Sequence, residues 1–501
     1  MRPKFRSLNL FFLAIVLVPS VLAQKPAREE KPDFGPIKTE LQKKVADGTL
    51  PSVSIGVTKN GKTLWLESFG YADIGKKVPA TPDTIYALGS LSKSITATAV
   101  YRLVQDGKID LDQPIGRYLR SVTIDHRGRD PATYKVFHLL NMAAGIPHYW
   151  RYCYTSSGPL DKCRDELLGR ASFSAFSPGA VHTYSNLSLG LAAQMVADVS
   201  GEPLSMFMRR KIFGPARMKN TFTHVSEIPA NRTAIAQPYR ADGGLADSFQ
   251  FEPAGGGGYY STVNDLLRYG SMHLETRGRA ERVLRYEIQR ENHRVREGLP
   301  HEFYANGWGV LPLANGRRTL LSNGAIEGAA STLLVLPESG IVIVVLINKS
   351  VGNDVSDDIA FRIAGSLLPG YKKDLDSLFE RVGPSFGFAE FSADSELEGA
   401  WVGTVNVMSE KVPLEITFSG SSAALKLDTL ATVNAALRRG QGIITFSADI
   451  PGAGKLLRSS TDQVTFQARL EGGKLVGSVQ TEILTPRPEY LLAFPFTAAK
   501  K

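Results

Sequence analysis

Residues 87–100 read ALGSLSKSITATAV, an almost uncharged run with a serine and a lysine three positions apart. In a helix, positions i and i+3 share one face, so Ser90 and Lys93 are predicted to point the same way. Apolar or small residues surround them on every side, which is typical of a buried helix. Burial lowers the pKa of a lysine, and a neutral amine beside a hydroxyl can take its proton. The alternative is that Ser90 caps the helix and Lys93 extends to water.

A tyrosine and an asparagine stand directly before the next long apolar run. Tyr184-Ser185-Asn186 precedes the helical pattern that extends from Leu187 to Val199. Ser-x-x-Lys followed by Tyr-x-Asn resembles the first two motifs of the penicillin-recognising serine hydrolases, which include the class C β-lactamases, the D-alanyl-D-alanine peptidases and related esterases. Residues 304–306 also spell Tyr-x-Asn, but no helix is predicted after them, so we interpret this copy as chance.

The resemblance implies a role for each residue of the two motifs. Ser90 would be the nucleophile, and Lys93 and Tyr184 would move its proton. Nearby positive charge would lower the pKa of the Tyr184 phenol. Asn186 would offer its amide to the acyl side chain of the substrate. The alternative for Tyr184 is an aromatic ring that packs on the core at the start of a helix.

A third motif is expected at a strand edge, where the family has Lys-Thr-Gly or His-x-Gly. The best match is residues 322–328, SNGAIEG. Ser322 stands where the cation is usual, so anionic β-lactams are expected to bind less well, and neutral esters or amides become more plausible. Ser322, Gly324 and Ala325 are the expected substrate-binding residues here, and the backbone N–H groups of Ser90 and Ala325 would form the oxyanion hole.

Three other segments bear on the cleft or on nucleotide binding. Residues 142–144 are Met-Ala-Ala, where the family has polar residues, which puts the local polar contacts in doubt. The glycine run 255–258 is expected beside the cleft and lacks the spacing of a dinucleotide fingerprint. Residues 56–63 match the phosphate-binding pattern G-x-x-x-x-G-K-[ST]. A strand pattern follows, however, where that motif needs a helix, so we reject it.

The predicted fold class is α/β. The resemblance implies an antiparallel sheet with flanking helices, beside a helical subdomain that holds the Ser-x-x-Lys helix, over residues 30–370. The pattern agrees: a helix is predicted over 35–46, a hairpin over 52–69 and two apolar central strands over 331–336 and 341–347. A closing helix is predicted over 355–368.

The rest of the chain is predicted to form a linker and a small β domain. Residues 371–396 are interpreted as a connector. Residues 397–501 contain short strand patterns separated by glycine-rich turns, which indicates an antiparallel sandwich or barrel. This part resembles the lipocalin-like appendages of some of these hydrolases, and no catalytic constellation is recognisable in it.

The first 23 residues have the layout of a secretory signal peptide: a basic start, an apolar centre and a small-residue end. We expect a cleaved leader and a periplasmic or secreted protein with no integral membrane segment; the alternative is an uncleaved anchor. In an oxidising compartment we expect Cys153 and Cys163 to pair, the alternative being two free thiols.

Composition excludes some classes of partner. The net charge is +9, and it falls by three to +6 without the basic residues of the leader. No basic block stands out, so nucleic-acid binding has little support. The eight histidines show no metal-ligand spacing, and we predict neither a metal nor a cofactor. The expected partner is a small-molecule or peptide substrate, and the oligomeric state stays open.

The leading interpretation is an exported serine hydrolase that forms an acyl-enzyme. β-Lactams, D-Ala-D-Ala peptides and esters or amides all fit the same constellation. No Gly-x-Ser-x-Gly elbow supports an α/β-hydrolase route. The alternative is a non-catalytic binding protein with a degenerate penicillin-binding cleft, which Ser322 and residues 142–144 motivate.

Overall fold

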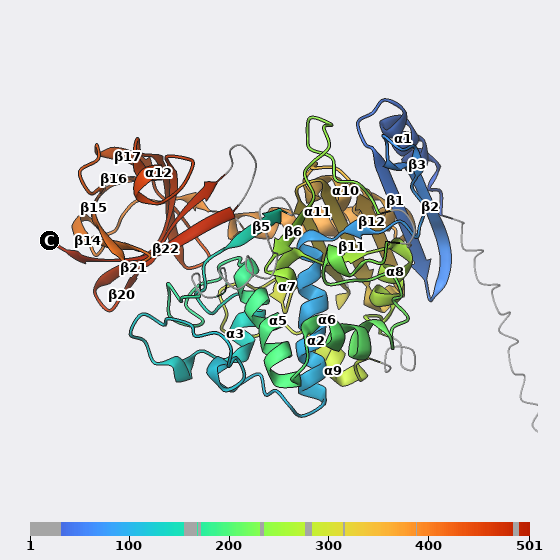
Figure 1. Cartoon of the computed structure of the whole chain (residues 1–501), viewed down its shortest axis with the longest axis horizontal. Helices are drawn as coiled ribbons and strands as arrows, with labels where there is room; N and C mark the ends of the chain where they lie inside the picture. Colours follow the sequence, from blue (N-terminus) through green and yellow to red (C-terminus); the bar gives the residue numbers. More distant parts are fainter. Residues whose placement is uncertain are drawn as a thin grey trace, which may run out of the picture. The chain divides into compact units, whose positions relative to one another are not determined.

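The structure, a computed structural model, describes residues 32–154, 168, 172–230, 235–275, 283–313, 316–386, 388–483 and 490–501 (Figure 1). The predicted leader and Cys163 lie outside these residues. In this part of the chain, no helix combines the length and the apolarity that crossing a membrane requires.

An eight-stranded antiparallel sheet forms the centre of the first domain. In spatial order its strands are β3 (Val78–Pro79), β2 (Lys62–Asp73), β1 (Ser52–Lys59), β12 (Ile341–Ile347), β11 (Ala329–Leu336), β10 (Arg318–Ile326), β9 (Trp308–Pro312) and β8 (Tyr304–Ala305). Every residue of β11 and β12 is buried, because both strands are central and covered on both faces. The two apolar strands predicted from the sequence are thus confirmed.

Alternate residues of β12 pack into two different cores. Ile343 and Val345 belong to the same hydrophobic core as residues of α1 (Gly35–Ala46), α10 (Asn353–Leu367) and α11 (Tyr371–Phe386). Val344 and Leu346 face the opposite side, where α8 (Val263–Ser271) and the helical subdomain pack. This alternation is the period of two expected of a strand, so one sheet joins two helical layers.

The helical subdomain surrounds α2 (Ser92–Gln105), as Figure 1 shows. Its other helices are α3 (Val136–Leu140), α5 (Asn186–Ser200), α6 (Leu204–Met208), α7 (Ala254–Gly257) and α9 (Tyr286–Asn292). Eleven of the residues of α2 are buried, which agrees with its apolar character on every side. The short strands β4 (Tyr86–Ala87) and β7 (Tyr260–Ser261) pair beside its start.

The hairpin β1–β2 contains the segment that matches a phosphate-binding motif. Asn60 and Gly61 both have positive φ, as a two-residue type I′ turn requires. A strand, not a helix, follows Lys62, so no helix N-terminus is available for phosphate. Gly56 instead lets α8 approach the sheet: a Cβ there would lie 2.4 Å from Val263 Cγ1. The rejection of this motif is confirmed.

The stretch interpreted as a connector begins with a long helix. Tyr371, Leu375 and Leu378 of α11 are buried in the same core as α1 and α10. The helix therefore packs on the sheet as part of the first domain's structure, although its amphipathic pattern was not recognised in the sequence.

The C-terminal domain is a near-closed antiparallel barrel. Its strands are β14 (Gly399–Val407), β15 (Glu410–Ser419), β16 (Ser422–Leu427), β17 (Val433–Ala436), β18 (Arg438–Gly440), β19 (Ile443–Asp449), β20 (Gln463–Glu471), β21 (Lys474–Ile483) and β22 (Tyr490–Lys500), with β13 (Ala389–Glu390) outside β18 and the short helix α12 (Ala453–Leu456) before β20. The curved sheet ends at β13 on one side and at β17 on the other, and β18, the neighbour of β13, is separated from β17 in the chain by Leu437 alone.

Aromatic side chains occupy the interior of this barrel. The ring centroids of Phe418 and Phe446 are 5.8 Å apart, those of Phe446 and Phe466 are 5.1 Å apart, and Phe466 lies 5.8 Å from Phe496. Strand β22 also pairs with β5 (Trp150–Tyr154), which in turn pairs with β6 (Phe249–Glu252) of the first domain. The predicted small β domain is therefore confirmed as a barrel.

Candidate active site

Ser90 lies on a 3₁₀ turn, Gly89–Leu91, that leads directly into α2. Its Oγ is 2.8 Å from the Nζ of Lys93 and 2.5 Å from the hydroxyl of Tyr184. The structure thus brings together the three residues predicted to be catalytic. Ser90 precedes the α-helix instead of lying within it, and the i, i+3 relation still places its side chain next to Lys93.

The ammonium position of Lys93 is surrounded by neutral groups. In addition to its contact with the hydroxyl of Ser90, Nζ has two acceptors: it donates to the Oδ1 of Asn186 and to the backbone carbonyl of Gly256, both at 2.5 Å. Only 2% of the residue is exposed, and no carboxylate in the described ranges forms an ion pair with it. Burial therefore holds the pKa of Lys93 well below its usual range.

This set of partners fits a neutral amine. A neutral amine has two N–H groups and one lone pair. Asn186 and Gly256 supply two acceptors, which leaves the third direction, toward Ser90 Oγ, for the lone pair. In that state the amine can accept the proton of the serine hydroxyl.

The expected lowering of the Tyr184 pKa is wrong. Desolvation raises the pKa of Tyr184 to about 12, and the hydrogen bond with Ser90 opposes this only in part, although 43% of the residue remains exposed. The expectation assumed a positive charge nearby. Lys93 Nζ is indeed 4.7 Å from the ring centroid, but the low pKa of Lys93 favours its uncharged form. Tyr184 is therefore a protonated phenol near neutral pH.

Helix α5 and the glycine run hold Lys93 in place. Ser185 caps α5 by accepting the N–H of Ser188, which positions Asn186 in the first turn. Gly256 packs against this turn, because a Cβ on it would lie 2.5 Å from the carbonyl oxygen of Asn186. The glycine run is thus beside the cleft, as expected. Asn186 is buried and accepts from Lys93, so its contact with a substrate stays a prediction.

Strand β10 passes very close to the nucleophile turn. A Cβ at Gly324 would lie 2.4 Å from the backbone nitrogen of Ser90, and one at Gly89 would lie 3.1 Å from the backbone nitrogen of Ala325. Only glycine permits this approach at Gly324. The two backbone N–H groups expected to form the oxyanion hole therefore belong to segments in direct contact.

Ser322 is not placed to contact a substrate. It is 3% exposed, and its hydroxyl donates to the Oγ of Ser94 at 2.8 Å. Its side chain therefore faces α2, on the same side of β10 as Gly324. We expected Ser322 to keep a hydrogen bond for the substrate; in this structure that hydrogen bond is used inside the protein.

Two aromatic residues near Tyr184 were missed in the sequence. The ring of His148 is edge-on to that of Tyr184, with centroids 5.3 Å apart, and its Nδ1 accepts the N–H of Asn186 at 3.4 Å. Burial and the proximity of Lys93 lower the pKa of His148 to about 3. His148 follows the Gly-Ile-Pro segment, which was its only signal.

The second residue, Tyr304, belongs to the copy of Tyr-x-Asn that we interpreted as chance. Burial, and then the proximity of Tyr184, raise the pKa of Tyr304. The asparagine of this copy, Asn306, hydrogen-bonds to Asn141, to Tyr101 and to the backbone of Asn292. This copy therefore stabilises the subdomain and makes no contact with Ser90 that the structure records.

The remaining predictions concern cysteines and metals. Cys153 takes part in a disulfide, and its predicted partner Cys163 lies outside the described residues. Within those residues, no group of three or more His, Cys, Asp or Glu side chains is arranged to hold a metal ion.

Comparison with known proteins agrees with this arrangement. The family model described as Beta-lactamase matches residues 37–367. The chain therefore belongs to the beta-lactamase family, as the three motifs predicted.

Similar proteins include a beta-lactamase of Escherichia coli (strain K12), 26% identical over 64% of this chain and 89% of that protein. Protein flp of Staphylococcus aureus (strain MW2) is 23% identical over 62% of each chain. A solved structure, the octameric penicillin-binding protein homologue from Pyrococcus abyssi, covers 92% of this chain and is itself covered completely, with 21% identity and a TM-score of 0.57. That similarity shows the fold.

Proposed function

We propose that this chain is a serine hydrolase in which Ser90 forms an acyl-enzyme with neutral esters or amides. The observation that carries the proposal is the position of Ser90 Oγ between the buried amine of Lys93 and the phenol of Tyr184. A buried neutral base beside a hydroxyl activates a nucleophile. The family includes proteins named for β-lactam hydrolysis, which also proceeds by acyl transfer.

In the proposed reaction, the proton of Ser90 passes to Nζ of Lys93 while Oγ forms a bond to the carbonyl carbon. The backbone N–H groups of Ser90 and Ala325 stabilise the negative charge on the carbonyl oxygen. Tyr184, as a protonated phenol, gives its proton to the leaving oxygen or nitrogen and regains one from Lys93. Water then adds to the acyl-enzyme, its proton returns through the same groups, and the acid and free Ser90 are released.

The preference for neutral substrates follows from the third motif. Ser322 replaces a cation and is bound to α2, so the third motif, residues 322–328, provides no positive charge for a substrate carboxylate. An anion would also have to approach Ser90 without a charged Lys93 to attract it. A neutral acyl donor needs neither group, because backbone N–H groups suffice for its carbonyl oxygen.

The test is intact mass and turnover with two acyl donors, benzylpenicillin and p-nitrophenyl butyrate. We expect turnover of the ester to exceed that of the penicillin, and Ser90→Ala to abolish both the adduct and the turnover. Ser94→Ala is the matched control, because Ser94 lies on the same helix but bonds to Leu91 and Ser322. Folded protein that forms no adduct and turns over neither donor would instead favour the non-catalytic binding protein.

We further propose that the chain is exported to the periplasm or the medium. The composition of residues 1–23 supports this, and so does the disulfide at Cys153, because such bonds persist in oxidising compartments. Mass spectrometry of the expressed protein is expected to show an N-terminus at residue 24. An intact Met1 in a protein confined to the cytoplasm contradicts export.

A further inference from the structure

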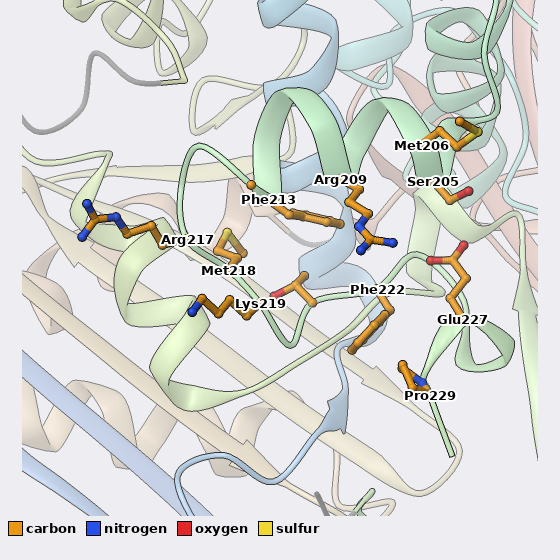
Figure 2. Close-up of a pocket in the computed structure, with 12 residues that line it drawn as sticks. Ser205, Met206, Arg209, Phe213, Arg217, Met218, Lys219, Phe222, Glu227 and Pro229 are labelled. Atoms are coloured by element: carbon orange, nitrogen blue, oxygen red, sulfur yellow. The ribbon is translucent and has the colours of Figure 1, made fainter. Parts of the chain in front are cut away.

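A second pocket lies in the helical subdomain, apart from the residues around Ser90. Its volume is about 490 Å³, within the usual range for small-ligand sites. It is lined by α6, by the π-helical turn Arg209–Phe213 and by the segments after them as far as Pro229 (Figure 2). None of its residues has a part in the reaction proposed above.

Three cationic side chains border this pocket, and none of them has an ion-pair partner within the part of the chain that the structure describes. Arg209, Arg217 and Lys219 are exposed, and among the described residues no carboxylate pairs with any of them. The neighbouring cations differ: Arg210 is paired with Glu202, and Lys211 with Asp106. In this segment, the cations without a carboxylate partner among the described residues are therefore the ones that line the pocket.

The wall between the cations is apolar. Phe213 and Met218 form part of it and are 4% and 3% exposed. Met206, at the rim, is 58% exposed, which is unusual for so large an apolar side chain. Figure 2 shows the Arg209 guanidinium above the ring of Phe222, with Lys219 across the pocket and the Arg217 guanidinium farther out on the Lys219 side.

The acidic residue of the lining, Glu227, is committed to other partners. Its carboxylate accepts from the N–H and the hydroxyl of Thr223 and lies 3.2 Å from Nδ1 of His224. His224 carries one positive charge between Glu227 and Glu252, so these three groups together hold one negative charge. Against that single negative charge stand the three cations Arg209, Arg217 and Lys219, so the net charge around the pocket is positive and favours an anion.

We propose that this pocket binds an amphipathic anion, with a carboxylate or phosphate head between Arg209 and Lys219 and a hydrocarbon chain along Phe213, Met218 and Phe222. A charged head gains from two unpaired cations, and the chain removes apolar surface from water. Such a group can come from a free fatty-acid-like anion or from an anionic lipid. This site is separate from Ser90, so it stands whether or not the proposed reaction does.

The experiment measures binding of decanoate to the full chain by calorimetry, with acetate and decanol as the probes that lack the chain or the charge. Decanoate is expected to bind more tightly than either. Arg209→Ala and Lys219→Ala are each expected to weaken decanoate binding about fivefold, and the double variant about 20-fold. Met206→Gln is expected to weaken decanoate binding and leave acetate unchanged.

Arg210→Ala is the matched control, because it removes a cation from the same turn that is already paired with Glu202. It is expected to bind decanoate within twofold of the parent. Equal binding of decanoate by the parent and the double variant, or of decanoate and decanol by the parent, overturns the proposal. So does the absence of any decanoate binding up to its solubility.

A second experiment distinguishes a free amphipathic anion from the head group of an anionic lipid as the ligand. The parent and the double variant are sedimented with vesicles of phosphatidylglycerol or of phosphatidylcholine. Sedimentation only with phosphatidylglycerol, lost in the double variant, identifies a lipid head group as the ligand. Decanoate binding without sedimentation identifies a free anion; either result supports the site.

Discussion

Lys93 and His224 are two basic residues of one helical subdomain, Lys93 buried and the His224 side chain 22% exposed, and their pKa values shift in opposite directions. Burial lowers the pKa of Lys93 well below its usual range, because its partners are a hydroxyl, an amide oxygen and a backbone carbonyl. Burial also opposes the charged form of His224. There, however, the hydrogen bonds to Glu227 and Glu252 outweigh it and raise the pKa to about 9.

The difference shows that the partners of a buried base decide its charge. His224 lies 3.2 Å from Glu227 and 3.3 Å from Glu252, and the latter is only 3% exposed. The charge and hydrogen bonds of the two carboxylates compensate for the water that the imidazolium loses on burial. The neutral oxygens around Lys93 carry no full negative charge, so they do not compensate for the burial of an ammonium. One residue is thus suited to accept a proton, the other to hold one.

Among the substitutions considered, replacing Lys93 is expected to reduce activity most. Lys93→Met removes the proton acceptor of Ser90, so kcat/KM for an ester substrate is expected to fall about 10³-fold. For Lys93→Arg, kcat/KM is expected to fall by the same factor, because a guanidinium keeps its charge and has no lone pair that could accept a proton. The control is Lys211→Met, which removes a cation already paired with Asp106. Activity of Lys93→Arg within tenfold of the parent contradicts the role of a neutral base.

Giving Lys93 a carboxylate is expected to make it resemble His224. In Asn186→Asp, the new charge next to Nζ favours the ammonium and raises the pKa of Lys93. We expect kcat/KM at pH 7 to fall about 10- to 100-fold, and the acid limb of its pH profile to move to higher pH. Asn186→Leu is the comparison: it loses the hydrogen bond without adding charge, so its acid limb is not expected to move upward. An unmoved limb in Asn186→Asp counts against the assignment of that limb to Lys93.

The smallest effect is expected at His224, and on stability alone. Its folded pKa of about 9 exceeds the ordinary value of 6.5, so the charged form stabilises the fold fully below pH 6.5. That contribution is lost as the pH rises through 9. His224→Gln is therefore expected to lower the free energy of unfolding by about 2 to 3 kcal/mol near pH 6 and by much less at pH 10. Urea unfolding of both proteins at the two pH values measures this, and an equal loss at both contradicts it.

Local patterns predicted the centre of the site. The spacing of Ser90 and Lys93 and the placement of Tyr184 before a helix depend on residues close together in the chain, so the sequence could reveal them. The contact between Gly324 and the Ser90 turn was expected only from the family resemblance. The direction of the Ser322 side chain could not be predicted, because it depends on which face of β10 meets α2.

The misses share a physical cause. The position of His148 in the site depends on its contacts with the Tyr184 ring and the Asn186 amide, and residue spacing in the sequence does not predict such contacts. Helix α11 begins just after a proline and a glycine and was interpreted as a connector, although Leu375 and Leu378 bury one of its faces. Strands β16 to β18 are short, and their pairing partners, not their composition, define them.

The pairing of β1 with β12 bears on how the chain is made. Val53 lies opposite Ile347, and the hydroxyl of Ser52 donates to Asn348 across a separation of 296 residues. Because the chain is made from the N-terminus, β1 and β2 are available long before β12. Until β12 has been made and has paired, one edge of β1 has no partner strand. An unpaired apolar edge invites aggregation, and contacts so distant in the chain form slowly. Chains in which β12 has not yet paired with β1 are therefore expected to be the ones most prone to aggregate.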